Sequence, residues 1–182
     1  MNLKNTLLGL VTLAGTVTTP ALAGYQYDGV YLMDGSDFTG NEVVATEMIN
    51  NLNEMGIPVV DGGKNDLPMC ESRENSILLG AYAPGPNIMI ICSDHGRKDL
   101  MFETLVHETV HVIQDARDGL ENDTLGEGND EYLNRLVSDL DPRKADNIVA
   151  LYDQSDYAVE IEAFYFEDKA ETVSNELNRW AF

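Results

Sequence analysis

The sequence predicts an α+β fold, in which a small mixed β-sheet comes first and helices follow. Segments typical of strands are short apolar runs rich in β-branched residues, and all of them end before residue 93. After residue 97 the segments show helical spacing of apolar residues and are separated by turn residues. Strands and helices that are segregated along a chain in this way favour an α+β architecture.

The first expected elements lie between residues 30 and 60. A short strand over about 30–33 follows a Gly- and Asp-rich opening. Asn41 is placed to cap a helix that runs to about residue 55, where Gly56 stops it. Residues 57–60 then form an edge strand, because Pro58 has no N–H to donate within a sheet.

A β-hairpin follows a polar, turn-rich stretch over 61–75. Residues 76–82 and 87–92 are strand-like, and the second run is nearly all apolar. The Ala-Pro-Gly-Pro sequence at 83–86 joins them as a turn.

The rest of the chain is expected to be helical. A stretch without Gly or Pro ends at Gly119, Asp141 and Pro142 together form a helix start, and Ser155 can cap the last helix. The expected helices cover 98–117, 129–140, 142–152 and 155–180.

The N-terminal residues are typical of a secretory signal peptide over 1–23. Lys4 gives a positive start, residues 7–14 are an apolar run too short to cross a bilayer, and 21–23 read Ala-Leu-Ala. No later stretch is apolar and long enough for a membrane anchor. We therefore expect one exported domain over 24–182, either periplasmic or released from the cell.

The chain has two cysteines, Cys70 and Cys92, and export would place them in an oxidising compartment. In an oxidising compartment such a pair is more often a disulfide than two free thiols, and this one closes a loop worth about 3 kcal/mol. The alternative, a pair of thiolate zinc ligands, is disfavoured because the cysteines are not closely spaced.

The charge excludes two classes of partner. Lys and Arg number 11 against 32 Asp and Glu, a formal net charge of −21. This field repels nucleic acid and anionic membranes. We attribute the charge to solubility rather than calcium binding, since the acidic stretches at 34–37 and 115–130 do not fit EF-hand spacing.

The strongest motif is His107-Glu108-x-x-His111 within the expected helix 98–117. Residues four apart lie on one helix face, so both imidazoles can bind one metal ion. Glu108 is then placed to take a proton from a water on that metal. One alternative is two buried histidines paired with carboxylates. A di-iron site is excluded because neither His95 nor His107 has a Glu three residues before it.

A catalytic zinc site takes three protein ligands, and no histidine follows His111. The third ligand must therefore be a carboxylate. Glu160 and Glu162 are candidates, because both lie among apolar residues of the last expected helix, where burial needs a compensating positive charge. Ala163 is small enough for another helix to approach closely.

His107-Glu108-x-x-His111 with Glu160-x-x-Ala163 resembles the gluzincin branch of the zincin-like zinc metallopeptidases, and the layout matches over about 76–170. The resemblance implies Zn²⁺ as cofactor, Glu160 as third ligand with Glu162 as the fallback, and an edge strand that pairs with a peptide or protein substrate. The gluzincin aspartate four residues after the ligand is replaced by Phe164. The short acidic form is also similar to small secreted proteins of cyanobacteria and cyanophages.

The implied activity is hydrolysis of peptide bonds, with Glu108 as general base. Four side chains are candidates to stabilise the oxyanion: Tyr152, Tyr157, Tyr165 and His95. The competing hypothesis is a non-catalytic secreted binding module on a zincin scaffold.

Overall fold

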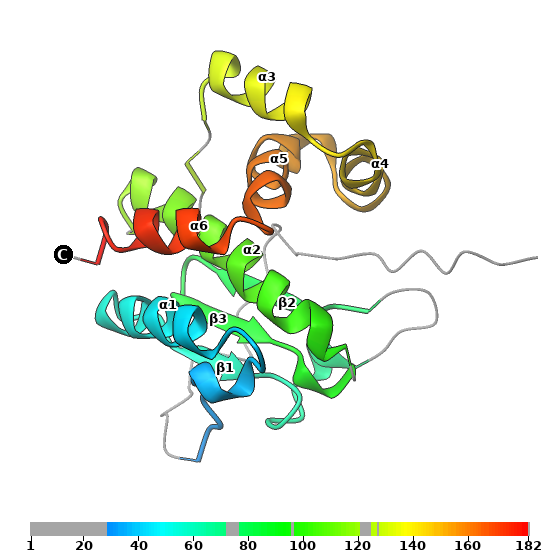
Figure 1. Ribbon diagram of the computed structural model, residues 1–182. Coiled ribbons are helices and arrows are strands. Elements are labelled where there is room, and N and C mark those ends of the chain that lie inside the picture. The colour runs from blue at the N-terminus through cyan, green and yellow to red at the C-terminus, as the bar shows by residue number, and fades with distance from the viewer. Residues whose placement is uncertain (1–28, 72–76, 96, 121–124, 127, 182) are drawn as a thin grey trace, which may run out of the picture.

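The computed structural model describes residues 29–71, 77–95, 97–120, 125, 126 and 128–181 (Figure 1). The signal peptide predicted for 1–23 lies outside these residues. Within them the fold is α+β, as predicted, with a three-stranded mixed sheet and six α-helices.

The sheet has the strand order β1-β3-β2. Its strands are β1 (Val59–Asp61), β2 (Gly80–Ala83) and β3 (Ile88–Ile91). β1 pairs with β3 in parallel and β2 pairs with β3 in antiparallel, which confirms the predicted hairpin. β1 lies at one edge, directly after Pro58, as the missing N–H predicted.

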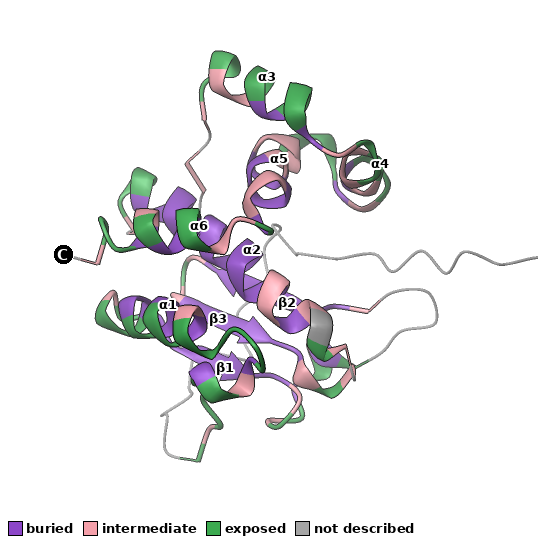
Figure 2. Ribbon diagram, viewed as in Figure 1, coloured by how far each residue is buried: buried purple, intermediate pink, exposed green. Residues whose placement is uncertain are grey.

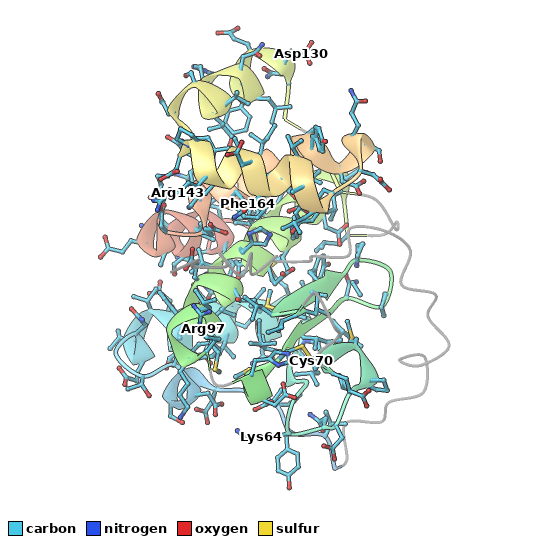
Figure 3. The ribbon with its side chains drawn as sticks, turned by 90° about the vertical axis from the view of Figure 1, so that its right-hand side faces the viewer. Lys64, Cys70, Arg97, Asp130, Arg143 and Phe164 are labelled. Carbon is cyan, nitrogen blue, oxygen red and sulfur yellow. A yellow bond between two sulfur atoms is a disulfide. The ribbon has the colours of Figure 1, made fainter. Side chains whose placement is uncertain are left out.

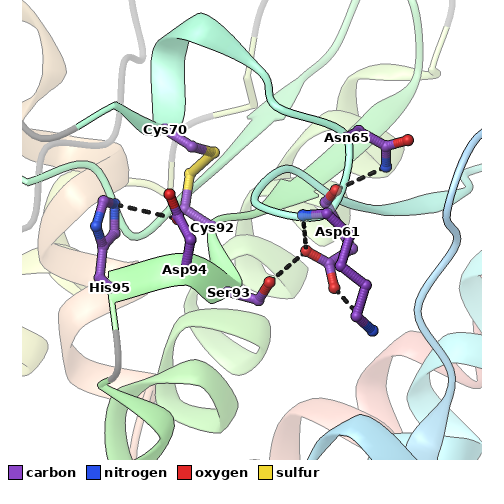
Figure 4. The surroundings of a disulfide bond; sticks show 8 residues. Asp61, Asn65, Cys70, Cys92, Ser93, Asp94 and His95 are labelled. Carbon is purple, nitrogen blue, oxygen red and sulfur yellow. Dashed lines mark hydrogen bonds and ion pairs between the residues drawn. A yellow bond between two sulfur atoms is a disulfide. The ribbon is translucent and has the colours of Figure 1, made fainter.

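β3 is buried on both faces, which explains its unbroken apolar sequence. Met89 and Ile91 face the main core with α1 and α2, whereas Ile88 and Ile90 face a smaller core on the opposite side. That second core contains the Cys70–Cys92 disulfide, as predicted (Figure 4). The bond ties the 3₁₀ turn Pro68–Cys70 to the end of β3, just before the longest helix.

Two helices cover the main-core face of the sheet. α1 (Glu42–Glu54) packs against β1, and α2 (Lys98–Asp118) packs against β2 and β3. Gly56 at φ +81° ends α1, and Gly119 at φ +107° caps α2, as their positions predicted. Asn41 precedes α1 but makes no side-chain capping hydrogen bond.

The remaining helices form two groups on α2. α5 (Tyr157–Phe166) lies along α2 and carries α3 (Asp130–Asp139) and α4 (Pro142–Leu151) on its other side. α6 (Ala170–Leu177) returns to α1 and α2. Figure 2 shows the consequence: α2 and the strands are largely buried, whereas α3 and α4 consist mainly of exposed and half-buried residues.

The single helix predicted over 155–180 is wrong, because it breaks between α5 and α6. No Gly or Pro stands at the break. Instead the Lys144 Nζ donates to the Phe164 carbonyl and the Lys169 Nζ donates to the Tyr165 carbonyl, so cations satisfy the last turn of α5. Ser155 lies in a 3₁₀ turn, and α5 begins two residues later.

The strand predicted over 30–33 is reduced to one antiparallel bridge, between Leu32 and Val60. The Asn65 side chain explains this, because it accepts from the Tyr31 N–H and donates to the Asp61 carbonyl. These two backbone groups would bond each other if the antiparallel pairing continued, whereas the Tyr31 carbonyl still accepts from the Asp61 N–H.

Candidate metal centre

The two histidines of the motif point from α2 toward α5. His107 and His111 are 0% and 2% exposed, and their ring centroids are 5.0 Å apart. The four-residue spacing puts them on one helix face, as expected. Ala163 is completely buried where α5 meets α2, which confirms the close approach of a second helix.

Glu160 on α5 completes the group. One of its oxygens lies 3.4 Å from the His107 Nε2 atom and the other lies 3.5 Å from the His111 Nε2 atom. A metal ion held tetrahedrally at about 2.1 Å puts its ligand atoms about 3.4 Å apart. His107, His111 and Glu160 could therefore hold a metal ion.

The chemistry of these atoms fits an ion. Among the described residues, neither Nε2 atom has a hydrogen-bond partner of good geometry, although both are buried. Burial lowers the pKa of His107, but the nearby carboxylates of Glu160 and Glu167 together raise it more strongly, to about 10. Burial lowers the pKa of His111. The carboxylates therefore stabilise positive charge at His107, whereas burial favours the neutral form of His111, which is the form that can bind a metal ion.

Each imidazole donates a hydrogen bond from its Nδ1 atom to an acceptor that was not predicted from the sequence. The His107 Nδ1 atom donates to a Glu167 oxygen at 3.0 Å, and the His111 Nδ1 atom donates to the Gln114 side-chain oxygen at 2.8 Å. Protons on both Nδ1 atoms leave the Nε2 lone pairs free for a metal. Gln114 could have been found from its position three residues after His111, on the same helix face.

Glu167, and not residue 164, supplies the hydrogen-bond acceptor for the His107 imidazole. It lies seven residues after Glu160, just past the end of α5. The Phe164 ring instead packs edge-on against the His107 ring, with centroids 5.0 Å apart. Phe164 is labelled in Figure 3 and also contacts the apolar residues of α4, so it fills the space between α4 and the histidine.

Glu162, the fallback ligand, is not part of the group that could hold a metal ion. Its oxygens accept from Arg117 at 2.7 and 2.8 Å, from the Tyr132 hydroxyl at 2.7 Å and from the Gln114 Nε2 atom at 3.1 Å. Gln114 also donates to the Val159 carbonyl. Glu162 therefore orients Gln114, and Gln114 orients His111.

Glu108 lies beside this group, and only one of its two carboxylate oxygens accepts a hydrogen bond from the described residues. Its Oε2 atom accepts from the Tyr82 backbone N–H at 2.8 Å, so strand β2 fixes the carboxylate. Its Oε1 atom is buried and has no hydrogen-bond partner among the described residues. Burial raises the pKa of Glu108 to about 8, against the opposing charge of His107.

The four candidates for oxyanion stabilisation have other surroundings. Tyr152 and Tyr157 pack in an apolar cluster with Phe164, and the Tyr165 ring lies 3.6 Å beneath the Lys169 ammonium. The His95 side chain is only 5% exposed and lies near Asp94 (Figure 4).

A cavity of about 530 Å³ opens beside the metal centre, between α2, α3, α5 and α6. Arg117, Tyr132 and Glu162 line it together with apolar residues. Neither the three candidate ligands nor Glu108 is among its lining residues.

Comparisons of the chain with models of protein families, with curated proteins and with solved structures found no match. In the part of the chain that the structure describes, no helix combines the length and the hydropathy needed to cross a membrane. The site's own geometry is therefore the basis for assigning a function.

Proposed function

We propose that this protein is a secreted zinc-dependent metallopeptidase that hydrolyses peptide bonds with Glu108 as general base. One observation carries the proposal. The Nε2 atoms of His107 and His111 lie 3.4 and 3.5 Å from the two oxygens of Glu160, and the neighbouring Glu108 keeps a buried carboxylate oxygen with no hydrogen-bond partner among the described residues. A purely structural site does not need that fourth group.

The donor set favours zinc. Two imidazole nitrogens and one carboxylate oxygen are the ligands of many catalytic zinc sites, which leave a fourth position for water. Zinc bound by His107, His111 and Glu160 would supply Lewis acidity, acidifying a water molecule and polarising a carbonyl group.

The chain's own groups would handle the proton. The Tyr82 N–H holds the Oε2 atom of Glu108, which leaves Oε1 to take a proton from the attacking water. The same carboxyl then passes the proton to the departing amine. Glu167 and Gln114 keep the two imidazoles in the tautomer that binds metal.

A peptide substrate agrees with the position of β2. This strand lies at the edge of the sheet, and the backbone of Tyr82 reaches Glu108. An extended peptide that added to this edge would run past Glu108, as in β-strand addition.

Secretion is part of the proposal. The Cys70–Cys92 disulfide is typical of oxidising compartments. The first 23 residues have the pattern of a signal peptide, which also agrees with export.

A binding module without catalysis is the second candidate. The burial of the ligands favours it, because no side chain among His107, His111 and Glu160 is more than 3% exposed. The neighbouring cavity, which would then bind the partner, is lined by none of them.

The Glu108→Gln variant separates these functions. Zinc content and hydrolysis of fluorescently labelled casein and of a mixed peptide library are measured for wild type, Glu108→Gln and Glu47→Gln, a matched change on the exposed face of α1. We expect Glu108→Gln to keep its zinc and lose about 10²–10⁴-fold in rate, the usual range for a general base. Zinc-loaded wild type without hydrolysis would favour the binding module, and unchanged activity in Glu108→Gln would exclude the proposed mechanism.

A further inference from the structure

Lys144 connects the exposed helix α4 to the metal centre. Its ammonium lies 3.0 Å from the Glu167 Oε1 atom, 2.8 Å from the Phe164 carbonyl and 3.3 Å from an Asp168 oxygen. The Glu167 Oε2 atom accepts from His107. The two oxygens of one carboxylate therefore join a lysine to a candidate metal ligand.

This carboxylate lies among others of the same charge. Glu103 is within hydrogen-bonding reach of Glu167, Glu160 lies on the other side of His107, and Asp168 is the next residue in the chain. Among the described residues, Lys144 is the lysine that contacts Glu167, and its side chain is only 19% exposed. Without it, repulsion would favour rotation of Glu167 away from His107.

We propose that Lys144 is a positioning residue of the metal centre: it fixes Glu167 in the orientation that accepts from His107 Nδ1, and thereby strengthens metal binding. This inference rests on the proposed zinc site. It assigns a role to α4, a helix that contributes no ligand. Partners behind a metal-binding histidine typically change metal affinity by about 10–100-fold when they are lost. Because Lys144 acts one contact further from the metal, we expect its replacement to change metal affinity by an amount at the lower end of that range.

Lys169 provides a matched control. It follows the end of α5 in the chain, and its ammonium, like that of Lys144, lies at the last turn of this helix. It contacts the Tyr165 carbonyl and Asp168. No contact joins it to Glu167 among those that the described residues make. Lys169→Met therefore removes the same charge from the same region and leaves the link to His107 in place.

The test measures Zn²⁺ affinity by competition with a chelator for the whole protein and its variants. We expect Lys144→Met to weaken affinity by about tenfold and Lys169→Met to change it by less than about twofold. Lys144→Arg, which keeps the charge, should recover most of the loss. Lys144→Gln removes the charge but keeps a polar donor, so it should show the same loss and replaces the Met variant if that one does not fold.

A second readout separates positioning from general stability. In imidazole NMR of the zinc-loaded protein, the His107 Nδ1–H signal should move in Lys144→Met and Lys144→Gln and stay in place in Lys169→Met. An unmoved signal, or equal losses of affinity in the variants of the two lysines, would overturn the inference while the zinc site stands. A wild type that binds no zinc would remove the proposed function, and this inference with it.

Discussion

Replacing Glu167 by Gln tests the residue that most clearly distinguishes this site from a bare His-Glu-x-x-His motif. Glu167 accepts from His107 through one oxygen and from Lys144 through the other. A glutamine keeps the shape and one acceptor but loses the charge. Its amide nitrogen must then face a donor, either the imidazole N–H or the ammonium.

The expected magnitude follows from these contacts. A hydrogen bond to a charged group contributes about 1.5–3 kcal/mol and a neutral one about 1 kcal/mol, so the change costs about 0.5–2 kcal/mol, or roughly 2–30-fold in metal affinity. The effect falls on His107 alone, because His111 is held separately by Gln114. Zinc binding should therefore weaken without being abolished.

Chelator competition measures this change directly. Glu171→Gln, on the exposed first turn of α6, makes the same change of charge nearby and serves as the control. An affinity of Glu167→Gln that stays within about twofold of wild type, or an equal loss in Glu171→Gln, would refute the role of Glu167 behind His107.

Three further predictions concern stability. Burial and then Glu167 raise the pKa of Glu103 from 4.5 to about 6, so its ionisation disfavours the fold as pH rises through this interval. Glu103→Gln should therefore stabilise by about 1 kcal/mol at about pH 8 and not at about pH 4, and thermal melts that gain equally at both would contradict this sign. Removing the Cys70–Cys92 disulfide by a double Ser variant should lower the free energy of unfolding by about 3 kcal/mol in urea titrations; no change would argue against the bond. Gly80→Ala should cost about 1–3 kcal/mol, because a Cβ there would lie 2.5 Å from a side-chain carbon of α2, and a variant as stable as wild type would show that this contact gives way.

The elements that the sequence predicted correctly are those governed by local rules. The spacing of His107 and His111 places them on one face of any helix. Pro58 excluded a central position for β1, and the apolar run before Cys92 indicated a buried strand. The pairing of Cys70 followed from there being only two cysteines.

What could not be predicted depends on contacts between distant segments. The break after α5 has no local signal, since lysine side chains cap the helix there and one of them, Lys144, comes from α4. Glu167 was missed for the same reason, because it reaches His107 from beyond the end of α5. The contact between Glu108 and Tyr82 uses a backbone N–H, which no residue type identifies.

The third ligand could be predicted only in part from the sequence, which left a choice between Glu160 and Glu162. Both are buried on α5, and sequence patterning alone kept both open as ligands. The structure separates them by their partners: Glu160 lies at the two imidazoles, whereas Glu162 is bound by Arg117 and Tyr132. Only the packing of α5 on α2 and of α3 on α5 could reveal this difference.

The most direct test of the proposed site is therefore the metal content of the purified protein, measured by elemental mass spectrometry alongside Glu160→Ala and Glu162→Ala. We expect close to one zinc per chain in wild type, its loss in Glu160→Ala, and its retention in Glu162→Ala at saturating zinc. Wild type that takes up no zinc when zinc is supplied, or Glu160→Ala that keeps a full equivalent, would contradict the proposed site.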